Sequence, residues 1–219
     1  FKSNFLNTFL NYDNYTDRHT PTLLIILATL NKLGFSLDLI RLLHLNILPL
    51  IVISSYKCLK LKFPDINKHI LFFISLVFFL SPTMRSISIW PDSRIWGVLF
   101  FIISLYFFLK FQQKQKFIDC VYNNIFLVIS SYFSPNFSIF FIYYFLSYLK
   151  FYKISTNIVW IIVLNVILSI PMFYYLIVLD VNFLTTHAIG SVDLFTRLNP
   201  SNKIFIISTL VFFYFIPFS

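Results

Sequence analysis

The chain consists of long apolar blocks separated by short polar segments. Each block is long enough to form a membrane-crossing helix, whereas the strands of a membrane barrel would alternate apolar and polar residues over about ten positions. The expected fold is therefore all-α, a polytopic helical membrane protein with about seven transmembrane helices in a single domain. The predicted spans lie at about residues 39–56, 69–84, 94–111, 118–134, 136–152, 157–179 and 204–219.

Composition supports a membrane protein. Hydrophobic residues make up 58% of the 219 residues, charged residues only 11%, and Phe occurs 30 times, which a soluble surface does not accommodate. A net charge of +9 would suggest nucleic acid as the partner of a soluble domain, but here the sidedness of loops accounts for it and no nucleic-acid partner is predicted. The start at Phe1 and the short last apolar block predict a fragment of a longer protein.

The lysines predict which loops face the cytoplasm. By the positive-inside rule, loops rich in lysine are cytoplasmic. This assignment requires residues 118–152 to cross twice, with a break at residues 134–136, where Pro135 removes a backbone donor and disfavours helix at the preceding residue. The alternative is one kinked helix, which would place Lys150 and Lys153 outside. The nine lysines assigned to the inner side are Lys57, Lys60, Lys62, Lys68, Lys110, Lys114, Lys116, Lys150 and Lys153.

Residues 21–33 form an apolar run that is too short to cross a bilayer, which needs roughly twenty residues. We predict that this run is an interfacial helix within an external segment, residues 1–38. Pro21 suits the first turn of such a helix. The ionisable residues Asp17, Arg18 and His19 therefore lie directly before a helix on the external face.

Arginines and acids distribute differently from lysines. With this topology all five arginines fall outside or at outer helix ends, which the positive-inside rule does not explain. Arginine binds phosphate or carboxylate with two parallel hydrogen bonds, so this distribution predicts an anionic substrate group on the outer face. The alternative is pairing with Asp and contact with lipid headgroups. The five arginines are Arg18, Arg41, Arg85, Arg94 and Arg197.

Three outer elements combine acids with arginines: residues 17–21, the loop 81–94 that contains Asp92, and the loop 180–203 that contains Arg197. A carboxylate near a substrate hydroxyl can act as a general base, and an arginine can hold a phosphate leaving group. Together these elements could transfer a group from a lipid phosphate. For Asp92 the alternative is a helix N-cap, which is a common use of Asp.

The sequence Asp17-Arg18-His19-Thr20-Pro21 resembles the Asp-x-His-Pro-Pro-like motif in the first external loop of the GT-C superfamily of membrane glycosyltransferases, with Thr in place of the first Pro. Trp90-Pro91-Asp92 is similar to that family's second external loop, where an Asp is common. The resemblance implies transfer of a sugar from a polyprenyl-phosphate donor to a glycan, lipid or protein acceptor, on the periplasmic side of a bacterial inner membrane. Asp17 and Asp92 are then candidate catalytic residues, and the candidate substrate-binding residues are Arg18, His19, Arg85, Arg94 and Arg197.

The resemblance leaves some assignments open. Some members of the family bind a divalent ion near the first-loop motif, which makes Asp17 and His19 candidate ligands; no further ligand is visible, and no metal site is predicted. In the family a first span and often an acid precede this motif, so the catalytic base is either Asp17 or a residue upstream of Phe1. Rival functions are a flippase or transporter of lipid-linked sugar and a polysaccharide polymerase or ligase. A transporter would be expected to carry ionisable groups at mid-membrane depth and Gly- or Pro-broken helices.

Overall fold

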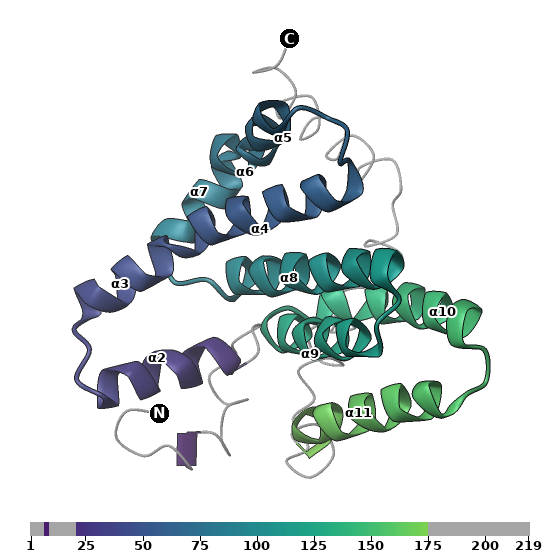
Figure 1. Cartoon of the computed structure of the whole chain (residues 1–219). Coiled ribbons are helices and arrows are strands. Elements are labelled where there is room, and N and C mark those ends of the chain that lie inside the picture. Colours follow the sequence, from purple (N-terminus) through teal and green to yellow (C-terminus); the bar gives the residue numbers. More distant parts are fainter. Residues whose placement is uncertain (1–6, 9–20, 175–219) are drawn as a thin grey trace, which may run out of the picture. The chain divides into compact units, whose positions relative to one another are not determined.

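The structure is a computed structural model that describes residues 7–8 and 21–174 (Figure 1). These residues belong to the first of two compact units, Phe1–Val181, and the regular elements within them are all helices. The elements in chain order are α2 (Thr22–Lys32), α3 (Leu37–Leu45), α4 (Ile47–Lys62), α5 (Lys68–Ser75), α6 (Val77–Leu80), α7 (Pro82–Ile89), α8 (Ser93–Lys114), α9 (Phe117–Phe133), the 3-10 helix η2 (Pro135–Ile139), α10 (Phe140–Tyr152) and α11 (Thr156–Phe173).

Several helices are apolar and long enough to cross a membrane. Three segments qualify on their own: Leu37–Lys62, which joins α3 and α4, Ser93–Lys114 and Thr156–Phe173. A fourth qualifies if the bent pair α5–α6 and α7 counts as one span. The predicted all-α fold is thus confirmed for the described residues, whereas seven spans are not established. The predicted span 204–219 lies outside the described residues.

The structure corrects the predicted span 69–84 and the loop after it. The chain turns by 64° at the break between Leu80 and Pro82, and α7 occupies much of the predicted external loop 81–94. Ser81 Oγ accepts a hydrogen bond from the Met84 amide, and Pro82 lies in the first helical turn. An N-cap followed by proline is a strong helix start, so a new helix begins where a loop was expected.

Helices α4 and α8 extend further than predicted. The first was expected to end near residue 56 and the second near 111, but they continue to Lys62 and Lys114. Lysine is a good helix former, and its long stem lets the ammonium group reach water from a helix end. Gln113 Nε2 also donates a hydrogen bond to the Leu61 carbonyl at 2.6 Å. The lysines of these segments therefore lie on helix ends rather than in loops.

Residues 118–152 form two antiparallel helices. Ser134 is extended, with φ −147° and ψ 105°, and η2 follows it directly. Cys120 Sγ, near the start of α9, is 4.0 Å from the hydroxyl of Tyr152 at the end of α10. The alternative of one kinked helix is therefore wrong, because a single helix would separate these two residues by its whole length.

Helices α8 and α9 form the central antiparallel pair (Figure 1). At one end Trp96 stacks on Phe133, with ring centroids 5.6 Å apart. Further along, Phe107 stacks on Phe126 at the same separation. Stacked aromatic pairs contribute about 0.5–1.5 kcal/mol each beyond the area that they bury. This ladder of rings fixes the register of the two helices.

Gly97 allows the chain after α9 to approach α8 closely. A Cβ atom at position 97 would lie 3.0 Å from Cε2 of Phe137 and 3.1 Å from Cβ of Ser134. The Gly97 carbonyl also accepts a hydrogen bond from Ser130 Oγ at 2.8 Å. Small residues permit such approaches between membrane helices.

We expect Gly97→Ala to destabilise the protein by about 0–2 kcal/mol, because overpacking costs about 1–3 kcal/mol while alanine gains about 1 kcal/mol in helix propensity. The free energy of unfolding is measured by titration with dodecyl sulfate in mixed micelles. A Gly97→Ala variant with a higher free energy of unfolding than the wild type would contradict close packing at this position.

Candidate functional site

Several helix termini meet at one end of the described bundle. The start of α8 contacts the end of α9 through the Trp96–Phe133 stack. The same Trp96 contacts His44 of α3, and Thr22 at the start of α2 contacts Tyr132 of α9. We call this the arginine end, because Arg41, Arg85 and Arg94 lie on the elements that meet there or lead into it.

His44 is a structural residue at the arginine end. Its side chain is buried, with 1% exposed. Nδ1 accepts a hydrogen bond from Trp96 Nε1 at 3.1 Å, so Nε2 carries the proton and donates to the Ile87 carbonyl at 3.0 Å. Both ring nitrogens are satisfied in the neutral tautomer. His44 therefore joins α3, α7 and α8, and its buried ring is not available to a substrate.

Asp92 and Arg94 interact closely at the start of α8. One Asp92 oxygen accepts a hydrogen bond from the Arg94 amide at 2.7 Å, so Asp92 is the N-cap of the helix. The Arg94 side chain binds the same carboxylate through Nε at 3.0 and 3.1 Å and through Nη2 at 2.6 Å. Among the described residues the Nη1 group takes no part in this pair, so it remains able to bind another acceptor. The cap and the ion pair fix both side chains at the arginine end.

The other described arginines of this end, Arg41 and Arg85, are also exposed. The Arg41 guanidinium lies 5.8 Å from the ring centroid of Trp90, just before α8, and 3.7 Å from the carboxylate of Asp38. Arg85 is exposed on α7, and within the described residues it forms no ion pair. These guanidinium groups carry hydrogen-bond donors at one end of the described bundle, and the external position of that end stays a prediction.

The first-loop motif lies outside the described residues except for its last residue, Pro21, so Asp17, Arg18 and His19 are not described, and neither is Arg197. The described chain resumes at Pro21, which has helical dihedral angles, φ −68° and ψ −8°, directly before α2. Thr22 Oγ1 donates a hydrogen bond to the Tyr132 carbonyl at 2.9 Å. The residue that follows the motif is therefore held against the last turn of α9.

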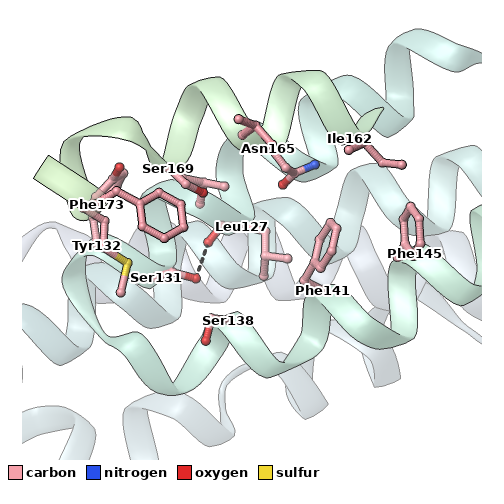
Figure 2. Close-up of a pocket in the computed structure, with 13 residues that line it drawn as sticks. Leu127, Ser131, Tyr132, Ser138, Phe141, Phe145, Ile162, Asn165, Ser169 and Phe173 are labelled. Carbon is pink, nitrogen blue, oxygen red and sulfur yellow. Dashed lines mark hydrogen bonds between the residues drawn. The ribbon is translucent and has the colours of Figure 1, made fainter. Parts of the chain in front are cut away.

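An apolar groove opens beside that contact (Figure 2). It has a volume of about 520 Å³ and runs between α9, α10 and α11. Tyr132, whose carbonyl binds Thr22, lines the groove. The other lining residues are Leu127, Val128, Ser131, Ser138, Phe141, Phe145, Ile162, Asn165, Val166, Ser169, Met172 and Phe173.

Most polar side chains of the groove already donate to the protein. Ser131 Oγ donates to the Leu127 carbonyl at 2.9 Å, the bond drawn in Figure 2. Ser138 Oγ donates to Pro135, Asn165 Nδ2 to Asn124 and Ile161, and the Tyr132 hydroxyl to Leu168. Because these donors are used internally, the groove presents a mainly apolar surface. Such a surface suits a hydrocarbon chain better than a sugar.

Sequence reasoning missed a set of buried polar residues on α8 and α9. Asn123 is fully buried, and its side-chain amide donates to the backbone carbonyl and the hydroxyl of Ser104 at 2.8 and 2.9 Å. The side-chain carbonyl oxygen of Asn123 accepts a hydrogen bond from the Tyr148 hydroxyl at 2.6 Å. Asp119, 1% exposed, lies 3.1 Å from the ammonium of Lys110. The signal was present, because Asp119 and Asn123 interrupt the apolar block 118–134. Polar side chains inside a membrane segment normally face the bundle.

Among residues 7–8 and 21–174, no group of three or more His, Cys, Asp or Glu side chains is arranged to hold a metal ion. Comparisons with models of known protein families, with curated proteins and with solved structures find no match. The inference of function therefore relies on the residues and their geometry.

Proposed function

We propose that this chain is part of a membrane glycosyltransferase of the GT-C kind, which moves a sugar from a polyprenyl-phosphate donor to a glycan, lipid or protein acceptor. The observation that carries the proposal is the hydrogen bond from Thr22 to Tyr132. It ties the residue after the Asp17–Pro21 motif to the backbone of Tyr132, a residue that lines the apolar groove. The motif thus leads directly to a surface suited to the hydrocarbon part of such a donor.

The proposal gives each part of the arginine end a role. The polyprenyl chain occupies the groove between α9, α10 and α11. Arg94 and Arg85, with Arg18 and His19, bind the phosphate. Asp17 accepts the proton of the acceptor hydroxyl as the acceptor oxygen bonds to the anomeric carbon, and the bond from that carbon to the phosphate oxygen breaks. Asp92 is the second candidate base, in addition to its contacts with α8.

The proposal also includes a topology. The chain forms about seven spans, with α2 as an interfacial helix, and it lies in a bacterial inner membrane with the arginine end on the periplasmic side. The lysines on the opposite helix ends support this orientation through the positive-inside rule.

The groove assignment predicts a specific effect on donor affinity. Val166 lines the groove and Ile167, the next residue of α11, does not; the two side chains are similarly exposed, at 57% and 55%. Val166→Trp should raise the KM for a polyprenyl-phosphate sugar by about tenfold or more, because displacing two methylene groups of the donor forfeits roughly 1.6 kcal/mol. The measurement is steady-state transfer by the whole protein in proteoliposomes.

Ile167→Trp is the matched control and should change KM by less than about twofold, since its ring faces away from the groove. Equal effects of the two variants would contradict binding of the donor in the groove. Movement of lipid-linked sugar across the bilayer without transfer would instead show a flippase and overturn the enzymatic proposal.

A further inference from the structure

A second concavity lies at the opposite end of the described bundle, away from the arginine end. It has a volume of about 570 Å³ between the last turn of α8 and α10. Its donors are Gln112, Gln115 and Lys150, and its apolar lining consists of Phe111, Tyr143 and Phe151. Ser147 also lines it, but its hydroxyl donates to the Tyr143 carbonyl at 3.1 Å. The surface therefore combines three hydrogen-bond donors with an aromatic floor.

The charges around this concavity are positive. Lys150 forms no ion pair with a described residue, and no acidic residue lines the concavity. Lys114, the last residue of α8, and Lys116, in the connection to α9, are exposed nearby. The nearby acid Asp119 is already paired with Lys110 at 3.1 Å. The net effect is an uncompensated positive field that favours an anion.

One of the donors, Gln115, has an unusual backbone conformation. Gln115 is the C-cap of α8 and has a left-handed conformation, with φ 54° and ψ 27°. This conformation is uncommon for a residue other than glycine, asparagine or aspartate. A glycine would satisfy the cap equally well, but it would carry no amide group into the concavity.

We propose that this concavity binds an anionic phospholipid, with the headgroup phosphate held by Lys150, Gln112 and Gln115 and the upper acyl chains against the exposed rings of Tyr143 and Phe151. Basic pockets between membrane helices on the lysine-rich side are suited to such headgroups. The aromatic floor distinguishes a lipid from free phosphate, because phosphate alone would leave the exposed rings of Tyr143 and Phe151 uncovered. The inference is independent of the glycosyltransferase proposal, since it concerns the other end of the bundle.

Native mass spectrometry of the purified protein in detergent tests this site. The protein is titrated with phosphatidylglycerol and, separately, with phosphatidylcholine, and the dissociation constant of the first bound lipid is measured. We expect Lys150→Gln to weaken phosphatidylglycerol binding by about tenfold or more, because it removes a charged hydrogen bond. Lys150→Arg should retain most of the affinity. Gln115→Gly should weaken binding about fivefold while leaving thermal stability unchanged or higher.

Lys153→Gln is the matched control, because Lys153 lies at the same end of α10 but does not line the concavity. It should weaken binding by no more than about fivefold, the part due to general surface charge. Equal losses for Lys150→Gln and Lys153→Gln would overturn the proposal, as would equal binding of phosphatidylcholine or wild-type affinity of Gln115→Gly. Displacement of the lipid by an excess of inorganic phosphate would assign the donors to phosphate and overturn the lipid site.

Discussion

Asp17→Asn is expected to lower the rate of sugar transfer by about a hundredfold or more, while affinity for the polyprenyl-phosphate donor changes much less. Asparagine keeps the shape and most hydrogen bonding of aspartate but cannot accept the acceptor's proton, and general base catalysis contributes about 10²–10⁴-fold. The rate is measured at saturating donor and acceptor with the whole protein in proteoliposomes. Donor binding is measured separately by equilibrium titration.

Two further variants make this result interpretable. Asp13→Asn changes an acid of the same predicted external segment, outside the motif, and should leave the rate within about twofold. Asp92→Asn retains an N-cap, because Asn caps as well as Asp, and it weakens the ion pair with Arg94, whose side chain is 58% exposed, so we expect a loss of stability of about 0–1 kcal/mol from this pair. If Asp17→Asn keeps its rate and Asp92→Asn loses it, the base is Asp92. If both keep their rates, neither residue is the base.

Lys110→Met is expected to destabilise the protein by about 3–5 kcal/mol. Lys110 is the counter-charge of Asp119, whose side chain is 1% exposed, and apart from this ammonium group, 3.1 Å away, no hydrogen-bond donor of the described residues satisfies the carboxylate. Removing one partner of a buried pair leaves an uncompensated buried charge, which has a cost of this size. Asp119 also lies in the first turn of α9, where the helix dipole favours it only modestly.

The difference in stability expected between substitution of Lys110 and substitution of Asp119 is the sharper test of the buried pair. Asp119→Asn should cost less than about 1 kcal/mol, because Lys110 is 30% exposed and can extend its ammonium group to water. The double variant should recover to within about 1 kcal/mol of the wild type. Lys114→Met, at an exposed lysine of the same helix end, is the control and should change stability by less than about 0.5 kcal/mol. Unfolding is followed by dodecyl sulfate titration, and similar losses for Lys110→Met and Lys114→Met would contradict a buried pair.

Local signals in the sequence predicted much of the helical pattern. The run 21–33, ended by Gly34, appears as α2, and Gly34 has the positive φ of 89° that ends such a helix. The Ser134–Pro135 break appears where it was expected, because proline and its predecessor restrict the backbone whatever surrounds them. The bend at Ser81–Pro82 was read as a loop, although the same serine–proline pair is also a helix start. A local signal of this kind specifies that a helix is interrupted but not which element follows.

The candidate sites likewise combine features that the sequence predicted with features that only the tertiary structure decided. The sequence by itself determined an all-helical membrane chain, the separation of lysines from arginines, and the acids and arginines that could handle an anionic group, because these properties depend on residue type and order along the chain. Only the tertiary structure decided that Asp92 pairs with Arg94, that His44 is enclosed by α3, α7 and α8, and that α9, α10 and α11 leave a groove beside Tyr132. These are contacts between residues far apart in sequence or choices between competing partners. They are fixed by the packing of whole helices, which depends on the summed shapes of many side chains and which no single motif encodes.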